Sequence, residues 1–385
     1  MDPRLLIGPS SPLGLPAPFG FLQFFKVLGF TLHMVPMHLW YAGVIVAVLL
    51  RGQRHEHAQR LGARLIKAMP IFIALGVNLG IVPLLFTQVA YHRVFYPATI
   101  LMAWPWLGIP FLLMFAYYGV YIYASALRKG GQSFRPLPQT AGWMSALFFV
   151  LIGFLFANGF SLMTRLSDWP SLWQNTSVAG APLGIGLNVG DPSLWPRWLL
   201  MFGLALLTTS TYITLDAGLF GSRETEGYRR WVKGFAWKLY LIGILWFGAT
   251  GSWYVFRTWP PELRQQMTSG PLGILFVLTA ISPGLVWLLM LAQMKRATRS
   301  FALLTGIAQF GVLALNGVSR QVVQNAELKA YLDVAAERVA TQWSPLVLFL
   351  VLFAAGLAVL GWMVAKAWEA SRREAPTGLD KTISI

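Results

Sequence analysis

Two histidines lie inside the first long apolar run of the sequence, where an ionisable side chain is costly and therefore a candidate for chemistry. His33 and His38 occur in FTLHMVPMHLW, with Pro36 between them where a helix would kink. Five residues at about 100° each separate the two imidazoles by about 140° around a helix, so they face different neighbours and do not share a ligand. Each is either an axial ligand of a b-type haem iron or a hydrogen-bonded structural histidine, because imidazole is the usual protein ligand of a non-covalent haem.

The other possible iron ligands are less favourably placed. His92, in QVAYHRVFY, is expected at a membrane interface as a second ligand, a proton-relay group or an interfacial residue. His55 and His57 belong to the basic stretch RGQRHEHAQR and are interpreted as solvated or lipid-facing residues. Methionine sulfur is the other common axial donor, and Met163 is expected at the depth of His33, although most of the 13 methionines in so apolar a chain are packing residues.

Amide and guanidinium side chains form a second group of candidates, for contacts with haem propionates or a quinone carbonyl. Asn158 lies near the end of one apolar run, where amides commonly bridge helices, and Arg165 closes the same run. Arg320 and Gln321 follow a later apolar run. A guanidinium offers planar, permanently charged donors to such groups, but the same arginines are also expected if they only snorkel toward the membrane surface.

These side chains must be positioned by a very apolar chain. Of its 385 residues, 56% are hydrophobic and 11% are charged, against about 25% charged in an ordinary soluble domain, which excludes a soluble protein. The absence of cysteine excludes disulfides, Cys-ligated zinc, iron–sulfur clusters and c-type haem on this chain. A net charge of +16 would indicate nucleic acid as the partner of a soluble protein. In a membrane protein it indicates basic loops beside anionic lipid, and no nucleic acid is expected.

Nine apolar runs are long enough to cross a bilayer, which takes about 20 residues as a helix. We therefore predict an all-α fold, a polytopic membrane helix bundle with nine transmembrane helices. The spans are expected at residues 27–50, 68–90, 98–127, 140–163, 198–219, 235–255, 272–294, 301–318 and 343–365.

The distribution of Lys and Arg supports this division and predicts its orientation. The connections after spans one, three, five and seven, together with the C-terminal tail, carry two thirds of the 30 Lys and Arg residues. Since cytoplasmic loops are enriched in basic residues, we expect the N-terminus outside and the C-terminus in the cytoplasm. The chain then divides into an outer N-terminal segment (1–26), a nine-helix membrane domain (27–365) and a cytoplasmic tail (366–385).

Two outer connections are long enough to have structure of their own. Residues 164–197 are rich in tryptophan, and we expect them to lie along the outer interface. Residues 319–342 have helical periodicity in their second half, which predicts a surface helix on the outer leaflet. The periodic positions are Leu328, Leu332, Ala335 and Val339.

Several short motifs resemble subunit I of the cytochrome bd quinol oxidases and, more closely, the bd-like membrane cytochrome b subunits of bacterial electron-transfer complexes. GVNLG at residues 76–80 is similar to the family's Gly-Val-x-x-Gly run, and Asn158 with Met163 is similar to the end of its fourth span. SRQ at residues 319–321 resembles its Gly-Arg-Gln-Pro-Trp, and His33 matches the haem ligand of its first span. Nine spans with an outer N-terminus are also similar to the family.

The departures from the family limit the chemistry that the resemblance implies. Leu200 and Met201 stand where the family has a haem-ligating histidine early in span five, and Asn316 and Gly317 replace an acidic haem ligand. The long quinol-binding loop between spans six and seven is missing, because only residues 257–271 connect them. These differences predict that an oxygen-reducing trihaem core is not formed.

The resemblance thus implies a membrane subunit of a respiratory electron-transfer complex in the bacterial inner membrane. The subunit is expected to carry one or two b haems near the outer face, or a quinone site, and to exchange electrons with an outer-face cytochrome or iron–sulfur protein. His33 and then His38 are expected as iron ligands, and no residue is predicted to be catalytic. The alternative hypothesis is a haem-free membrane anchor that docks the other subunits.

Overall fold

The computed structural model describes residues 2–129, 136–221, 224–295 and 298–373. The chain forms two compact units: unit 1 comprises Met1–Ser10 and Phe19–Glu337, and unit 2 comprises Ser11–Pro18 and Arg338–Ile385. Parts of three basic connections (130–135, 222–223 and 296–297) and most of the predicted tail (374–385) lie outside the described residues. The predicted division by side of the membrane stays a prediction.

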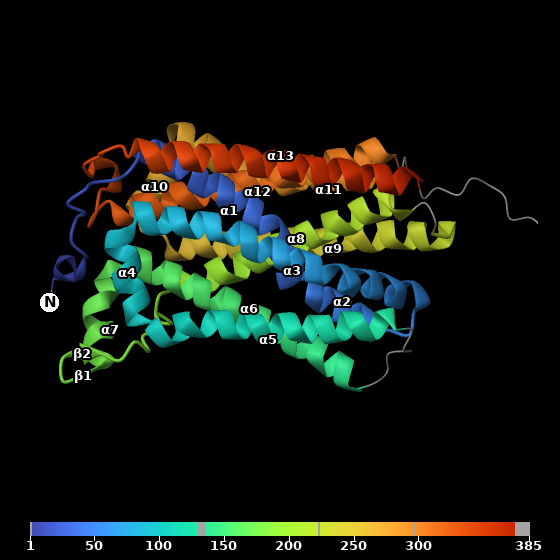
Figure 1. Cartoon of the computed structure of the whole chain (residues 1–385), viewed down its shortest axis with the longest axis horizontal. Helices are drawn as coiled ribbons and strands as arrows, with labels where there is room; N and C mark the ends of the chain where they lie inside the picture. Colours follow the sequence, from blue (N-terminus) through green and yellow to red (C-terminus); the bar gives the residue numbers. More distant parts are fainter. Residues whose placement is uncertain (1, 130–135, 222–223, 296–297, 374–385) are drawn as a thin grey trace, which may run out of the picture. The chain divides into compact units, whose positions relative to one another are not determined.

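Helices make up nearly all the regular structure of unit 1 (Figure 1). The α-helices are α1 (Phe19–Tyr41), α2 (Gly43–Arg51), α3 (Glu56–Ala90), α4 (His92–Leu101), α5 (Ala103–Arg128), α6 (Pro136–Thr164), α7 (Trp169–Asn175), α8 (Leu194–Leu219), α9 (Glu226–Trp253), α10 (Pro261–Thr268), α11 (Gly270–Lys295) and α12 (Arg299–Leu328). The short elements are the 3₁₀ turns η1 (Pro3–Leu6), η2 (Leu166–Asp168) and η5 (Val334–Ala336), the π-helical turn η4 (Tyr254–Thr258), and the antiparallel hairpin of β1 (Ser177–Val178) and β2 (Ala181–Pro182).

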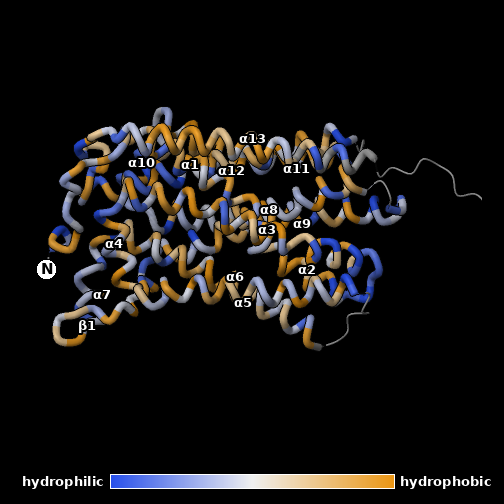
Figure 2. The backbone as a smooth tube through the Cα atoms, viewed as in Figure 1, coloured by the Kyte–Doolittle hydropathy of each residue, from blue (hydrophilic) through white to orange (hydrophobic). Residues whose placement is uncertain are grey.

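Nine helical segments of the described chain are long and apolar enough to cross a membrane, which confirms the predicted all-α, nine-span bundle. They are Phe19–Arg51, Glu56–Ala90, Ala103–Arg128, Leu137–Thr164, Leu194–Leu219, Glu226–Thr258, Gly270–Met294, Arg299–Leu328 and Trp343–Met363. Figure 2 shows that hydrophobic residues predominate along the helices of unit 1, whereas the connection between α2 and α3 is hydrophilic.

Glycines let α1 and α3 approach each other closely. A Cβ atom added at Gly76 would lie 2.5 Å from Nε1 of Trp40, and one added at Gly80 would lie 2.8 Å from Cε1 of His33. Both distances are shorter than a non-bonded contact, so any larger residue would push the rings of α1 away from α3. The GVNLG motif at 76–80 therefore has a physical role, since its two glycines form the surface on which the rings of α1 lie.

A row of hydroxyl side chains runs along α8 inside unit 1. Thr208, Thr211 and Thr214 are buried, and each donates a hydrogen bond to the carbonyl four residues earlier. This pattern satisfies the hydroxyls within their own helix, as polar residues in a membrane span require. The oxygen of each hydroxyl keeps the capacity to accept a hydrogen bond from another helix.

The connections of unit 1 gather at two ends (Figure 1). The α7 end holds α4, α7 and the hairpin, and there Gly8 N donates to the carbonyl of Arg93 (2.8 Å). The α2 end holds the connection from α2 to α3 and the start of α9. At this end Arg64 of α3 forms ion pairs with Asp216 of α8 (2.8 Å) and with Glu224 (3.0 Å).

Two expectations about helix boundaries are wrong. The first helix begins at Phe19, ahead of residue 27, and includes the buried Lys26. The surface helix predicted for residues 319–342 is absent from this described segment, because α12 continues through residues 319–328 and η5 is the only later helical turn before 343. Hydropathy placed the start of the first span too late and the end of the eighth span too early. The terminal turns of α1 and α12 bury polar side chains against polar partners rather than against apolar ones.

Unit 2 contains a short backbone pairing and the helix α13 (Trp343–Arg373). Leu15 N donates to the carbonyl of Arg338 (2.8 Å), and Ala340 N donates to the carbonyl of Leu15 (2.9 Å). Gly14 has a φ of +70°, and a Cβ there would lie 2.6 Å from the carbonyl oxygen of Arg338, so only glycine fits this turn.

Candidate functional site

His33 is partly buried on α1 and faces α3. Its Nδ1 lies 2.8 Å from the carbonyl oxygen of Gly76, so Nδ1 carries the proton and donates it. Nε2 is then left with its lone pair, and among the described residues it has no hydrogen-bond partner. A carbonyl that fixes Nδ1–H in this way is the usual support of a metal-ligating histidine.

His38 faces different helices from those that His33 faces, as the spacing predicted. Its side chain is 0% exposed, and its Nδ1 lies 3.0 Å from Oγ1 of Thr208. The Thr208 hydroxyl donates to the carbonyl of Leu204 (2.9 Å), so it accepts from Nδ1–H of His38. Gln309 also donates to this hydroxyl (3.3 Å), and Nε2 of His38 is buried without a partner among the described residues. His38 thus belongs to a closed polar layer of α1, α8 and α12.

His92 and Met163 lie toward the α7 end, and neither has a hydrogen bond to His33 or His38. Nδ1 of His92 lies 3.3 Å from the carbonyl oxygen of Val89, and its Nε2 is buried without a partner in the described part of the chain. Met163 is 5% exposed on α6. Nothing in the described residues brings either side chain to His33 or His38, and no three His, Asp or Glu side chains of these residues form a metal cluster.

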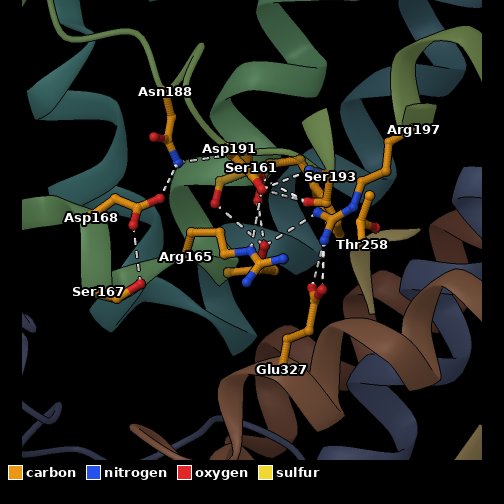
Figure 3. A network of polar contacts seen from close by, with 12 residues as sticks. Ser161, Arg165, Ser167, Asp168, Asn188, Asp191, Ser193, Arg197, Thr258 and Glu327 are labelled. Atoms are coloured by element: carbon orange, nitrogen blue, oxygen red, sulfur yellow. Dashed lines mark hydrogen bonds and ion pairs between the residues drawn. The ribbon is translucent and has the colours of Figure 1, made fainter. Parts of the chain in front are cut away.

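Asn158 and Arg165 both help to fasten the long connection between α6 and α8. Figure 3 shows Arg165 and its neighbours in this polar network. Asn188 N donates to Oδ1 of Asn158 (3.1 Å), and the side chain of Asn188 donates to Ser161 (3.1 Å). Asp191, whose side chain is 0% exposed, accepts from Ser161 (2.6 Å) and lies 3.3 Å from Nε of Arg165. These contacts use both sequence candidates to hold the connection in place.

Arg197, which sequence reasoning missed, is neutralised within the chain. It donates from Nη2 to both oxygens of Glu327 (2.6 and 2.8 Å; Figure 3). It also donates from Nε to the hydroxyl of Tyr254 (3.0 Å). The π-helical turn η4 presents Tyr254 to this pair. Since both charged side chains are about nine-tenths buried, each supplies the counter-charge that makes burial of the other tolerable.

Arg320 has a different environment from that of Arg197. Its guanidinium carbon lies 4.3 Å from the centre of the Phe30 ring and 3.9 Å from the centre of the Phe160 ring, and its side chain is exposed. No carboxylate of the described residues lies within 4 Å of it. Two aromatic faces stabilise a cation, but they leave its five N–H donors available to a bound group.

Gln321 lies in a second polar cluster, beside Arg320 on α12. Its Nε2 donates to the hydroxyl of Tyr91 (2.8 Å), which donates to Oδ1 of Asn325 (2.6 Å). Burial raises the pKa of the Tyr91 phenol above its ordinary value, so the hydroxyl stays protonated and can donate. Lys26 is 5% exposed, donates to Oε1 of Gln324 (2.7 Å) and lies 4.2 Å from the Tyr91 ring centre.

The α7 end therefore contains cations and an amide donor that no acid of the described residues satisfies. Lys26 and Arg320 have no acidic partner among the described residues, and Nε2 of Gln324 is buried without an acceptor there. Lys26 was missed because it precedes the predicted first span, and its signal was a lone lysine in FFKVLGF. The arrangement suits a group that brings acceptor oxygens, such as a carboxylate, a phosphate or a quinone carbonyl.

A b-type haem fits part of this arrangement. His33 has the tautomer and the partial opening that an axial ligand needs, and Phe30 lies one turn before it on the same side of α1, in contact with Arg320. His38 has the right tautomer but is enclosed, so a group reaching its Nε2 would have to open the packed core. The described residues thus offer a free imidazole nitrogen at His33 and free guanidinium donors at Arg320.

The fold and site together define a multi-pass membrane protein of the helical-bundle class, with a donor-rich polar layer near one end. No protein-family model matches the chain, and no curated protein matches it. Among solved structures, it is similar to a chain in the structure of bd oxidase from Geobacillus thermodenitrificans, with a TM-score of 0.67 and 14% sequence identity. The similarity covers 97% of this chain and 99% of that one, so the bd oxidase fold that the resemblance implied is confirmed.

Proposed function

We propose that this chain is a membrane subunit of a respiratory electron-transfer complex in the bacterial inner membrane, and that it binds one b-type haem or a quinone at the α7 end. The observation that carries the proposal is Arg320, an exposed guanidinium between two phenyl rings with no acid beside it, near the α1 surface that bears His33. The bd oxidase fold over nearly the whole chain supports the same assignment. We propose that the α7 end faces outward, toward a partner cytochrome or iron–sulfur protein.

Each residue would have a defined part in holding the bound group. The Gly76 carbonyl keeps the proton of His33 on Nδ1, which leaves the Nε2 lone pair for an iron. Arg320 would donate to a propionate or to a quinone carbonyl, while Phe30 and Phe160 hold its guanidinium plane and limit access of water. When bound, a b haem supplies a one-electron carrier within the membrane.

A reduced-minus-oxidised spectrum of the purified complex, with haem extracted and quantified, tests the haem assignment. We expect a b-type signal that His33→Ala abolishes and His57→Ala leaves unchanged, since His57 lies at the α2 end against Tyr228 and Trp231. Absence of any b-type signal in the wild-type complex would eliminate the cytochrome assignment.

The quinone assignment has a separate test. We expect ubiquinone or menaquinone at a stoichiometric level in the purified complex, and Arg320→Ala should lower its retention. Unchanged quinone content and unchanged quinol oxidation in Arg320→Ala would count against a quinone at this site.

A haem-free anchor is the second candidate function, and one observation favours it. Asn158 and Arg165 are already hydrogen-bonded or ion-paired inside the chain. The side chain of His38, the second candidate iron ligand, has no exposed surface. An anchor predicts a complex that assembles and transfers electrons without any haem or quinone on this chain. The haem quantification above separates the two candidates directly.

A further inference from the structure

One face of α9 forms a hollow of about 400 Å³ at the α2 end. The proposed haem or quinone site is at the other end, the α7 end. The hollow is lined by Gly227, Arg230, Trp231, Gly234, Phe235 and Lys238. Their spacing of three, four or seven residues places all of them on one face of the helix. The hollow lies beside the start of α3, where the rings of His55 and His57 contact Trp231.

The floor of the hollow is aromatic. The ring of Trp231 stacks with that of His55, at 5.1 Å between ring centres, and with that of Phe235, at 5.4 Å. The interplanar angles of 18° and 9° make this a nearly parallel stack of three rings. Such a stack is typical of the membrane interface, where amphipathic rings lie at the level of the lipid headgroups.

Glycine keeps the hollow open. A Cβ atom added at Gly234 would meet nothing within 4 Å, and one added at Gly227 would meet only Nε2 of His57, at 3.8 Å. Neither glycine is required by a helix–helix contact of the described residues, although glycine is a weaker helix former than alanine. The space beside Gly234 is therefore free for a bound molecule.

The rim of the hollow is positively charged. Arg230 has one acidic partner, Glu226, in an i,i+4 pair whose side chains are 82% and 79% exposed, so the pair is weak in water. Lys238 forms no ion pair with the described residues. The two cations lie about 12 Å apart along the helix axis, with the aromatic stack between their levels.

The same face becomes apolar immediately beyond Lys238. Ile242 and Leu245 lie four and seven residues further along and are 53% and 64% exposed. One continuous face of α9 thus presents cations and aromatic rings in its first half and exposed aliphatic side chains in its second half. A molecule complementary to this face has an anionic head and hydrocarbon chains.

We infer that this face of α9 is a binding site for an anionic phospholipid, independent of the proposed electron-transfer function. The phosphate lies between Arg230 and Lys238 on the Trp231–Phe235 stack, and the acyl chains run along Ile242 and Leu245. Basic pockets at this kind of interface bind anionic headgroups through charge and hydrogen bonds together.

The test measures lipid retained by the full-length protein, purified in its complex and reconstituted in nanodiscs of phosphatidylglycerol with phosphatidylcholine. Native mass spectrometry should find phosphatidylglycerol bound to the wild type. The double variant Arg230→Gln/Lys238→Gln should weaken its binding about thirtyfold, as two lost surface cations predict. Gly234→Leu, which keeps both charges and fills open space, should also displace the lipid.

Lys67→Gln is the matched control, because it removes an exposed lysine at the same end outside the hollow, and it should leave retention unchanged. Inorganic phosphate alone should not compete, since the site also requires the acyl chains. Unchanged retention in both hollow variants would overturn the inference. Full competition by inorganic phosphate would overturn it too, as would loss of a partner subunit instead of lipid in Gly234→Leu.

Discussion

Arg64 and Arg320, which lie toward opposite ends of unit 1, differ in how their charge is compensated. At the α2 end, Arg64 binds Asp216 and Glu224, and Arg60 binds the second oxygen of Glu224 (2.7 Å). At the α7 end, Glu327 neutralises Arg197, but Arg320 lies between aromatic rings. A cation that is matched by an acid of the same chain has a structural role, whereas a cation left with aromatic neighbours is available to a ligand. Stability measurements distinguish these two roles.

Arg197→Met should have the largest effect, because it leaves Glu327 about nine-tenths buried without a counter-charge. We expect a loss of about 3–5 kcal/mol in the free energy of unfolding, measured by denaturant titration of the full chain in detergent. The double variant Arg197→Met/Glu327→Leu should recover most of this loss. Equal losses in the single and double variants would show that the pair does not account for the effect.

Arg64→Met should have an intermediate effect at the α2 end. Its side chain is 31% exposed, and Arg60 still neutralises Glu224, so only Asp216 loses its partner. We expect a loss of about 2 kcal/mol, smaller than for a fully buried pair because solvent screens the charge left behind. The same titration measures it, and a loss as large as that of Arg197→Met would contradict the proposed difference between the ends.

Gly80→Ala should have a smaller but more localised effect. The added Cβ would lie 2.8 Å from the His33 ring, so α1 and α3 must separate slightly. We expect a loss of about 1–2 kcal/mol together with a shifted b-type spectrum if His33 holds an iron. Gly284→Ala is the control, because a Cβ there meets nothing within 4 Å, and it should change neither quantity.

Arg320→Met should have the smallest effect on folding, within about 0.5 kcal/mol, because no acid of the described chain loses a partner. The same variant should lose the bound haem or quinone. This combination of near-native stability with lost binding is expected only of a ligand residue. A loss of several kcal/mol would instead assign Arg320 a structural role.

The sequence was sufficient for the fold. Hydropathy and the distribution of Lys and Arg predicted nine spans, and the five-residue spacing of His33 and His38 predicted that they face different helices. It was not sufficient for the ends of α1 and α12, because Lys26 and Gln321 are polar yet buried. Hydropathy treats a buried polar turn as solvent-exposed.

The partners of the candidates were also beyond sequence reasoning. Asp191 and Glu327 lie in stretches interpreted as surface, and only the folded chain brings them to Arg165 and Arg197. An acid 130 residues away in the sequence cannot be paired with its arginine by spacing alone. The candidate site was therefore predicted as a set of donors, but which donors remain available emerges only from their tertiary contacts.

The close contact of α1 with α3 has a consequence for the order in which the chain assembles. These two helices hold the first two spans, so they can dock through Gly76 and Gly80 as soon as both have entered the membrane. His38 cannot be satisfied at that stage, because Thr208 belongs to the fifth span and is synthesised much later. The His38 imidazole therefore lacks its Thr208 partner until α8 has entered the membrane, and Gln309 completes the layer only when the eighth span follows.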